Sequence, residues 1–374
     1  MKKLIIYILN LPLYYFSILI PKNKNIWIFG AWFGNQYNDN SKELFEYVNL
    51  NHKDINAIWL TQSDDILVDM TRKGFKVYRT YSIQGYLYTM MAKYIFVSTG
   101  MADVNRYVAT TRYKIQLWHG TPLKKIQDDV SKNTKNTIQI IKDIVLPFNK
   151  SNYEYMTIPS KNTERNFKSA FSNVKNFEIT GYPRNDALKQ YTKTKKIIYL
   201  PTHRGEGKGS IENIFKTFNI EKINETLKKI GYELIVKMHF YDLSRISFDN
   251  QSNIKFLRES MDPYELLQES TILITDYSSI YFDFLLTQRP IIFTPFDIEE
   301  YQKKDREFYY NYEDVTPGPK CQDWNEVLIW IEMFVKDITL FEKERKEVNK
   351  KFNKFDDFKN SERVYQMIKE KCNA

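Results

Sequence analysis

A chain of 374 residues with 43% hydrophobic and 27% charged side chains can bury one large or two medium hydrophobic cores, which excludes a natively disordered protein. The 55 lysines and arginines exceed the 46 aspartates and glutamates and give a net charge of +9. This charge favours an anionic partner: nucleic acid, anionic lipid or a phosphorylated substrate. The two cysteines, Cys321 and Cys372, exclude a disulfide framework and a cysteine-based zinc site, and they fit a reducing cytoplasm.

An apolar run from Leu4 to Ile20 follows two lysines at the start of the chain. Asn10, Pro12 and Ser17 interrupt it, and it is shorter than the ~20 residues of a membrane-spanning helix. A cleaved signal peptide fits less well, because no small-residue cleavage site follows. Basic flanks and amphipathic aromatic residues predict a membrane-associating segment over residues 1–25, bound to an anionic membrane surface. A helix packed on the protein body is the alternative.

Short apolar, β-branched runs alternate with polar, helix-like stretches along most of the chain, which is the pattern of parallel β/α units. The first strands expected are Ile26–Phe29, Ile55–Leu60, Phe75–Tyr78, Tyr94–Val97, Lys114–Trp118, Tyr155–Ile158 and Phe177–Thr180. A lysine-rich stretch, Lys189 to Lys196, lacks apolar periodicity and predicts a linker. The pattern then restarts, with strands expected at Lys196–Leu200, Glu233–Met238, Asn253–Leu257, Thr271–Thr275 and Pro290–Thr294. From Trp324 onward the spacing is helical. The sequence therefore predicts an α/β protein with domains at 26–188 and 189–330, followed by helices over 331–374.

Polar segments follow several of the expected strands. In open α/β sheets, ligands bind beyond the carboxyl ends of the strands, since loops and helix N-termini converge there. Three of the four histidines, His119, His203 and His239, fall at such positions. An imidazole there can accept a proton near neutral pH, while a histidine that braces a turn is the alternative. After His119, Gly120 permits close backbone approach and Thr121 suits the start of a helix.

A second set of polar residues predicts phosphate binding. Ser278 and Ser279 lie where a strand gives way to a helix, and free N–H groups with serine hydroxyls favour an anion there. An ordinary serine cap explains one serine but not the second. The flanking carboxylates Asp276 and Asp283 are candidates for the same site. Near another strand end, Thr202 and Arg204 are further candidates, because a guanidinium can bind a diphosphate in a bidentate manner; a solvated loop arginine is the alternative.

Several common motifs are missing from the sequence. It contains no GxGxxG, Walker A, HExxH or DxD pattern, so hydride transfer, P-loop ATP hydrolysis and metalloprotease chemistry lack their usual residues. No metal-binding residues are predicted, no cofactor is assigned, and dependence on a divalent metal is left open. The basic residues are spread along the chain rather than gathered in one run, which argues against a nucleic-acid partner.

Seven motifs in order resemble those of the CDP-glycerol glycerophosphotransferase family of teichoic acid primases and polymerases. They are the Phe29–Gly34 segment with Asp39–Lys42, WHGTPLK at 118–124, PTHR at 201–204, KMH at 237–239, TDYSSIYFDFLL at 275–286, PIIFTPFDIEEY at 290–301 and PGP at 317–319. Two positions depart from the family pattern. His203 stands where an aromatic residue is usual, and Phe240 stands where a proline often follows the histidine.

The resemblance implies a GT-B type fold, in which two Rossmann-like domains face a cleft. The first would be the acceptor domain, and the second would hold most of the donor, CDP-glycerol. His119 matches the family's proposed base, supported by a carboxylate that the sequence does not identify. His239 and Arg204 match donor-phosphate contacts, and Ser278 and Ser279 match the diphosphate loop.

The reaction implied is an in-line displacement at the glycerol-bearing phosphorus, in which an acceptor hydroxyl attacks and CMP leaves. The acceptor would be a membrane-linked, undecaprenyl-type glycan, and the enzyme would be peripheral on the cytoplasmic face of the cell membrane. Alternatives are a donor such as CDP-ribitol for a wall or capsule polymer, a sugar-nucleotide glycosyltransferase, and a non-catalytic nucleic-acid binder. The short chain before the first expected strand favours a primase or a compact polymerase.

Overall fold

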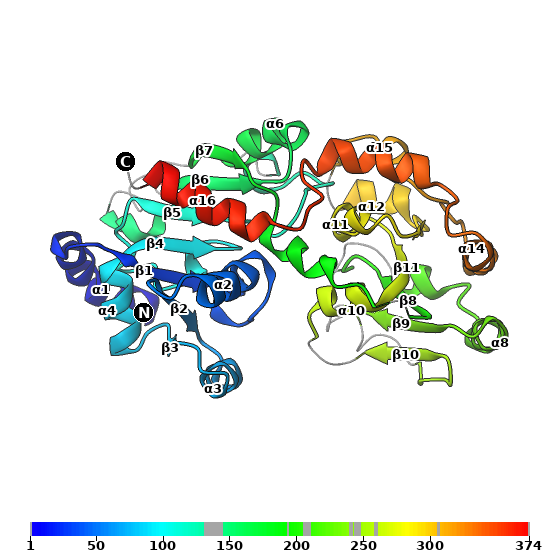
Figure 1. Ribbon diagram of the computed structural model, residues 1–374, viewed down its shortest axis with the longest axis horizontal. Helices are drawn as coiled ribbons and strands as arrows, with labels where there is room; N and C mark the ends of the chain where they lie inside the picture. Colours follow the sequence, from blue (N-terminus) through cyan, green and yellow to red (C-terminus); the bar gives the residue numbers. More distant parts are fainter. Residues whose placement is uncertain are drawn as a thin grey trace. The chain divides into compact units, whose positions relative to one another are not determined.

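The computed structural model describes residues 2–130, 145–192, 194–204, 211–238, 242, 248–257, 261–304 and 307–372. The chain divides into two units, each with its own parallel sheet (Figure 1). Unit 1 consists of Met1–His119, Gln127–Asp186 and Asp357–Ala374, and unit 2 of Gly120–Ile126 and Ala187–Asp356. The main division after Asp186 lies close to the expected linker.

Unit 1 is built on a seven-stranded parallel sheet in the order β3-β2-β1-β4-β5-β6-β7. Its strands are β1 (Asn23–Gly30), β2 (Asn56–Thr61), β3 (Val77–Arg79), β4 (Ala92–Val97), β5 (Tyr113–Gln116), β6 (Tyr153–Ile158) and β7 (Val174–Ile179). Each expected strand of this part is present, within a few residues at its ends. In the inner strand β1, Phe29 pairs with Trp59 of β2 and Phe96 of β4, and all three side chains are buried. The apolar runs therefore form strands because both faces of this sheet are covered.

Helices cover both faces of the unit 1 sheet. They are α1 (Lys2–Leu19), α2 (Asp39–Asn51), α3 (Asp64–Arg72), α4 (Ile83–Met91), α6 (Lys161–Ala170) and α16 (Asn360–Cys372), with short 3-10 turns η1 (Trp32–Gly34), η2 (Met101–Asp103), η3 (Gln127–Asp129), η4 (Pro147–Asn149) and η5 (Pro183–Lys189). α2 and α16 lie on one face (Figure 1). There Phe45 of α2 and Tyr365 of α16 pack around Trp27 and Phe29 of β1.

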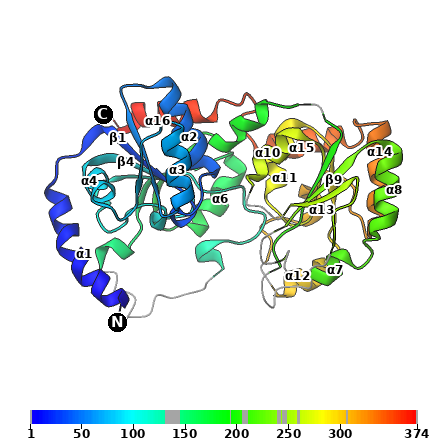
Figure 2. The same cartoon turned by 90° about the horizontal axis from the view of Figure 1, so that it is seen from below.

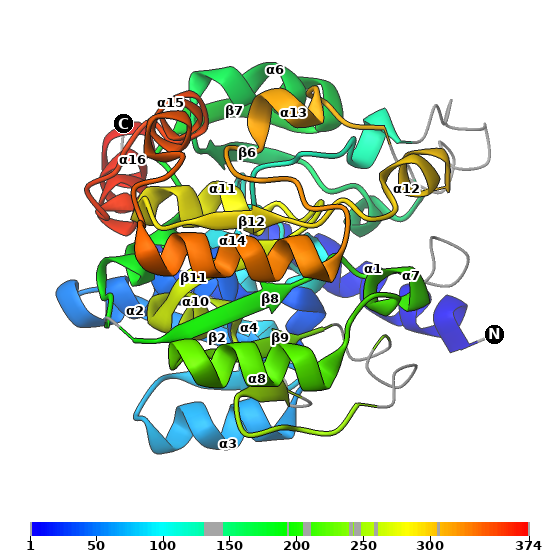
Figure 3. The ribbon, with the colours of Figure 1, turned by 90° about the vertical axis from the view of Figure 1, so that its right-hand side faces the viewer.

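Unit 2 has a five-stranded parallel sheet in the order β10-β9-β8-β11-β12. Its strands are β8 (Lys196–Leu200), β9 (Glu233–Lys237), β10 (Ile254–Leu257), β11 (Ser270–Thr275) and β12 (Ile291–Phe293). Its helices are α7 (Ile211–Phe215), α8 (Ile220–Ile230), α10 (Pro263–Glu269), α11 (Ile280–Phe284), α12 (Ile298–Lys304), α13 (Tyr312–Val315), α14 (Trp324–Lys336) and α15 (Glu342–Phe352), with the turn η6 (Leu285–Thr287). α8 and α14 cover one face of the sheet (Figure 3), where buried Trp324 packs edge-on against Tyr199 of β8. The predicted α/β class with parallel sheets is confirmed in both units.

The C-terminal helices are shared between the units. α14 and α15 belong to unit 2, whereas α16 returns to unit 1. The backbone N–H groups of Asn360 and Ser361 donate to Asp186, and Tyr365 stacks on His52 with ring centroids 3.6 Å apart. The expected C-terminal segment 331–374 therefore does not form one body in the structure.

Helix α1 lies along unit 1 beside α4 (Figure 2). On its inner side Tyr7, Leu11 and Tyr14 pack on a cluster that includes Tyr107 and Phe148. On its outer side large apolar residues stay exposed: Ile8, Leu9, Tyr15, Phe16 and Leu19. No helix in the described part of the chain has both the length and the apolar content that spanning a bilayer requires.

Candidate active site

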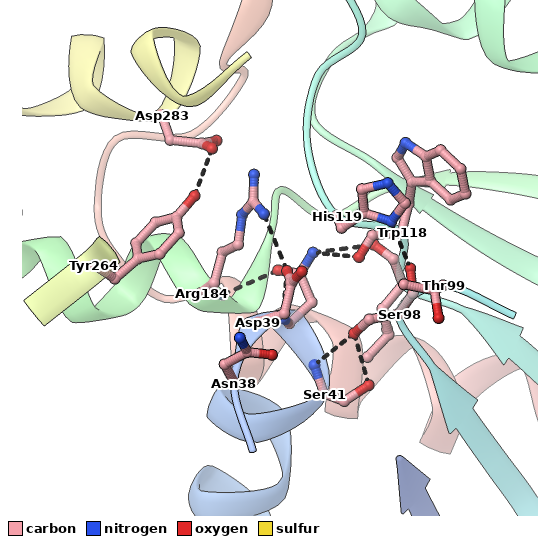
Figure 4. A network of polar contacts seen from close by, with 12 residues as sticks. Asn38, Asp39, Ser41, Ser98, Thr99, Trp118, His119, Arg184, Tyr264 and Asp283 are labelled. Atoms are coloured by element: carbon pink, nitrogen blue, oxygen red, sulfur yellow. Dashed lines mark hydrogen bonds and ion pairs between the residues drawn. The ribbon is translucent and has the colours of Figure 1, made fainter. Parts of the chain in front are cut away.

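His119 lies three residues beyond β5, and its imidazole is tied to the loop after β4 (Figure 4). Its Nδ1 is 3.0 Å from the carbonyl oxygen of Ser98. Because a carbonyl oxygen can only accept, Nδ1 carries the proton of the neutral ring and Nε2 keeps its lone pair. The ring also packs beside Trp118 and Trp32, with centroids 3.9 and 5.4 Å away. His119 is therefore held in the tautomer that can take up a proton at Nε2.

A buried ion pair sets the charge around His119. Arg184 Nη1 is 3.0 Å from Asp39 Oδ1, and Trp32 Nε1 donates to Asp39 Oδ2 over 3.2 Å. Burial lowers the pKa of His119, the negative charge of Asp39 opposes this shift, and the positive charge of Arg184 adds to it. Among the carboxylates that act on the pKa of His119, Asp39 has the largest effect. The sequence could not pair Asp39 with Arg184, because 145 positions separate them.

A second buried carboxylate fixes the loop that holds His119. Asp103 accepts hydrogen bonds from the backbone N–H groups of Ser98, Thr99 and Phe33 over 2.7–2.9 Å. Its side chain is fully buried, so each bond forms in a low-dielectric environment and is correspondingly strong. The carboxylate therefore holds the Ser98 carbonyl in the position that orients the imidazole.

Strained backbone surrounds the same side chain. Trp32, Phe33, Asp39 and Trp118 have φ between 46° and 66°, a region that large side chains rarely adopt. Asn40 holds this conformation, since its Nδ2 donates to the carbonyl oxygens of Leu117 and Trp118 over 3.2 and 2.9 Å. Gly120, with φ of 134°, follows His119 directly. Left-handed conformations of this kind cluster at functional sites, where surrounding contacts impose them.

In unit 2 the predicted phosphate contact Arg204 is completely buried. Its Nε and Nη2 lie 2.9 Å from the two carboxylate oxygens of Asp297, and Nη2 lies 2.7 Å from Asp276 Oδ2. The guanidinium also lies over the rings of Tyr277 and Tyr301, 5.1 and 4.8 Å from their centroids. Burial alone would lower the pKa of Arg204, but the two carboxylates overcome it and raise the pKa. The side chain is therefore committed to carboxylates and does not present itself to a ligand.

Arg204 and Asp276 together tie two loops at the carboxyl ends of neighbouring strands. Asp276 Oδ1 accepts from the backbone N–H groups of Thr202 and Tyr277 over 2.8 and 2.5 Å. Asp276, predicted from the sequence as a phosphate ligand, thus accepts hydrogen bonds from the backbone of both loops. Sequence reasoning missed Asp297, the second partner of Arg204, although it lies within the PIIFTPFDIEEY motif.

Ser278 and Ser279 occupy the predicted turn between β11 and α11. Both are partly exposed, and Ser278 Oγ lies 3.5 Å from the backbone nitrogen of Ile280 at the start of α11. Ser279 is the N-cap residue and makes no capping hydrogen bond through its side chain. An ordinary cap therefore does not account for its hydroxyl.

The buried hydroxyls of unit 2 that have no hydrogen-bond partner among the described residues include two at predicted site positions, Thr121 Oγ1 and Thr202 Oγ1. Such groups are rare in folded proteins and point to a contact with solvent or ligand. Asp283 is buried, and its Oδ2 accepts a hydrogen bond of 2.6 Å from the hydroxyl of Tyr264 (Figure 4).

The remaining predicted histidine, His239, lies outside the described residues. His203 lies near Asp242, with 2.7 Å between Nδ1 and Oδ2. Within the described ranges no group of three or more histidine, cysteine, aspartate or glutamate side chains could hold a metal ion.

The comparison with protein families settles the relationship. A family model described as CDP-Glycerol:Poly(glycerophosphate) glycerophosphotransferase matches residues 13–370. The chain belongs to this family. The predicted resemblance and the predicted enzyme class, a CDP-glycerol glycerophosphotransferase, are thereby confirmed.

Named relatives agree with the family assignment. The chain is 32% identical over 339 residues to a teichoic acid poly(glycerol phosphate) polymerase of Bacillus spizizenii, covering 83% of this chain and 84% of that protein. It is 30% identical over 371 residues to a teichoic acid glycerol-phosphate transferase of Staphylococcus aureus, covering 92% and 93% of the two chains. In fold it resembles the wall teichoic acid polymerase TagF, with a TM-score of 0.77, 22% identity and coverage of 100% and 96%.

Proposed function

We propose that this glycerophosphotransferase moves glycerol phosphate from CDP-glycerol to a hydroxyl of a membrane-linked acceptor in teichoic acid synthesis and releases CMP. The observation that carries the proposal is the position of His119 in a chain matched by the family over residues 13–370. Its Nδ1 proton is fixed on a carbonyl oxygen, and its Nε2 is available as a base.

Unit 1 supplies the base. The acceptor hydroxyl gives its proton to His119 Nε2 as its oxygen attacks the glycerol-bearing phosphorus, the bond from that phosphorus to the bridging oxygen breaks, and CMP leaves with that oxygen. The ring is then an imidazolium, which the negative charges of Asp39 and Asp103 stabilise. General bases of this kind contribute roughly 10²–10⁴-fold to the rate.

Unit 2 binds the donor, as in a GT-B type enzyme with two Rossmann-like domains. The hydroxyls of Ser278, Ser279 and Thr202 are the groups that donate to the diphosphate. Arg204 and Asp276 do not contact the diphosphate themselves. Their contacts with each other and with the backbone of Thr202 fix the loops that carry these hydroxyls. His239 keeps its predicted role as a phosphate contact.

Helix α1 holds the enzyme on the cytoplasmic face of the membrane as a peripheral protein. Ile8, Leu9, Phe16 and Leu19 are between 55% and 78% exposed although all are large and apolar. On α4, which contacts α1, Ile83 and Leu87 are exposed as well. Contiguous exposed apolar side chains of this size mark membrane or protein contacts.

The proposal is tested with CDP-glycerol, CDP-ribitol and a UDP-sugar, each incubated with the full chain and lipid-linked acceptor in vesicles. We expect CMP release from CDP-glycerol and a lipid product heavier by one or more glycerol phosphate units. His119→Ala should lower the rate of CMP release roughly 10²–10⁴-fold. Faster release from CDP-ribitol, or product formation from the UDP-sugar alone, would replace the assignment.

A further inference from the structure

Two hollows in unit 1 adjoin each other and contain none of the residues assigned above to the base. One, of about 510 Å³, has Arg112, Lys114, Lys175 and Glu154 in its wall, and is called the basic pocket. The other, of about 380 Å³, is called the hydroxyl pocket. Both are lined by Asn152, Tyr153, Ser172 and Asn173, so the two pockets share a wall, and together they are called the groove.

The hydroxyl pocket is lined mainly by amides and hydroxyls. Its amide residues are Gln116, Gln127, Asn149, Asn152 and Asn173. An amide offers a donor and an acceptor side by side, as a polyol or sugar hydroxyl does, and so matches hydroxyl-bearing ligands. The charged residues described in its wall are one acid, Asp128, and one base, Lys150, which leave no net charge. Asp128 already accepts two hydrogen bonds from Ser172.

This pocket shares its wall with the loops that position His119. Thr99 lines it and follows Ser98, whose carbonyl oxygen holds the imidazole. Gln116 lines it as well, and its Oε1 accepts the backbone N–H of Trp118 over 3.0 Å. A ligand in the pocket therefore contacts two residues that adjoin the segments around His119: Thr99, which follows Ser98, and Gln116, which holds the N–H of Trp118.

The basic pocket has the opposite character. Glu154 is the only acid among the described residues of its wall, and it pairs with Arg112 over 2.8 Å and with Lys175 over 3.1 Å. With Lys114 included, three cations face one carboxylate, and the excess favours a phosphate. Thr110, also in this wall, bonds through its hydroxyl to Ser17 of α1 and to Lys22 just beyond it.

We infer that this groove binds the acceptor as a chain of alternating phosphates and polyol units. A phosphate occupies the basic pocket, the adjoining polyol occupies the hydroxyl pocket, and the terminal hydroxyl reaches His119 Nε2. The lipid end of the acceptor then lies toward the C-terminal end of α1, the helix proposed to bind the membrane. The inference rests on the proposed function and adds the site and orientation of its second substrate.

The test measures binding of a fluorescent synthetic tetramer of glycerol phosphate to the full chain without donor. The double variant Arg112→Gln/Lys175→Gln should bind it about tenfold or more weakly, since both charge-assisted contacts to the phosphate are lost. The control Lys53→Gln/Lys73→Gln removes the same charge from exposed lysines of unit 1 and should change affinity less than twofold. Asn149→Ala should weaken binding of the tetramer but not of inorganic phosphate.

Equal affinities of the pocket variant and the control would overturn the groove, because the effect would then be net charge alone. CMP release from CDP-glycerol is measured on the same samples with lipid-linked acceptor. For the pocket variant we expect a raised KM for the acceptor and an unchanged KM for CDP-glycerol. Selective tetramer binding without any CMP release would leave the groove standing and remove the proposed reaction.

Discussion

The two ring nitrogens of His119 differ in their surroundings, as the proposed role of a base requires. Nδ1 is fixed by the Ser98 carbonyl, which is itself fixed by the hydrogen bonds of Asp103 to its loop. Because burial lowers the pKa of the ring, it stays neutral at pH 7 and is ready to take a proton. Asp39 limits that shift and so would stabilise the imidazolium that the proposed reaction forms.

Asp39→Asn should move the acid limb of the kcat/KM profile to lower pH and reduce kcat. Asp39 raises the pKa of His119 and Arg184 lowers it, so removing the carboxylate leaves the opposing cation and lowers the pKa further. The base then loses its proton at a lower pH, and the imidazolium is less stable in the transition state. The profile is measured from pH 5 to 8 by CMP release.

The control is Asp69→Asn, which also removes one negative charge, but from an exposed residue that pairs with Lys73. It should leave the acid limb of the kcat/KM profile at the pH of the parent enzyme. A shift of the Asp39→Asn profile to higher pH would show that another group provides the base.

Arg204→Met should destabilise unit 2 by about 3–5 kcal/mol, because it leaves Asp276 and Asp297 buried without their shared cation. The free energy of unfolding is obtained from urea titration. Adding Asp276→Asn and Asp297→Asn should recover part of the loss, since neutral amides are less costly to bury. If Arg204→Met causes no such loss of stability, and the two asparagines no such recovery, then the arginine does not stabilise the buried carboxylates.

At the scale of elements, apolar patterning located strands better than any other feature. β8 begins and ends at the expected residues, Lys196 and Leu200, because a buried parallel strand needs a continuous β-branched run. The left-handed backbone at Trp118 had no such signal, since it is imposed by Asn40 from another element. The pairing of Arg204 with Asp297 was hidden for the same reason: local sequence carries no record of distant contacts.

Helix α1 combines a face that packs on unit 1 with a face that is exposed. At 100° per residue, Ile8, Leu9, Phe16 and Leu19 fall on one side of the helix, opposite Asn10 and Ser17, which are buried. Lys22 anchors the C-terminal end by donating to the carbonyl oxygens of Ser17 and Met90. The apolar run of the sequence therefore supplies both the face of α1 that packs on unit 1 and the face that is exposed.

Replacing Ile8, Leu9, Phe16 and Leu19 together with glutamine should reduce sedimentation with anionic vesicles at least tenfold. Each side chain loses about 1.5–3 kcal/mol of transfer free energy if it enters the membrane fully. Because all four are exposed, thermal unfolding should hardly change. The matched control replaces Leu50 of α2 and Ile329 of α14, two exposed apolar residues on other helices, and should still sediment. Sedimentation of the α1 variant at the level of the parent would remove α1 as the anchor.

Across the whole molecule, the order of residues along the chain does not follow the division into units. His119 is the last residue before the chain passes into unit 2, where Gly120–Ile126 is held. Leu123 accepts the N–H of Tyr309 over 2.8 Å, and Lys125 donates its N–H to the carbonyl of Glu307 over 2.8 Å. The residue proposed as the base is thus joined covalently to a segment that unit 2 fixes.

The same interleaving makes the C-terminal helix a part of unit 1. Val364, Tyr365 and Ile368 of α16 lie in the cluster that contains Trp27 and Phe29 of β1. Truncating a buried aromatic or aliphatic residue of this kind typically costs about 2–5 kcal/mol, which is a large share of a domain's stability.

Removing residues 357–372 should therefore unfold unit 1 and leave unit 2 folded, although the deletion follows unit 2 in the sequence. Amide hydrogen exchange gives the readout: protection should disappear in β1 and β4 and persist in β8 and β11, whose packing uses α8 and α14. The milder variant Tyr365→Ala should lower protection in the same strands without abolishing it. Loss of protection in β8 and β11 to the same extent would mean that unit 2 cannot fold by itself and that the two sheets form one cooperative body.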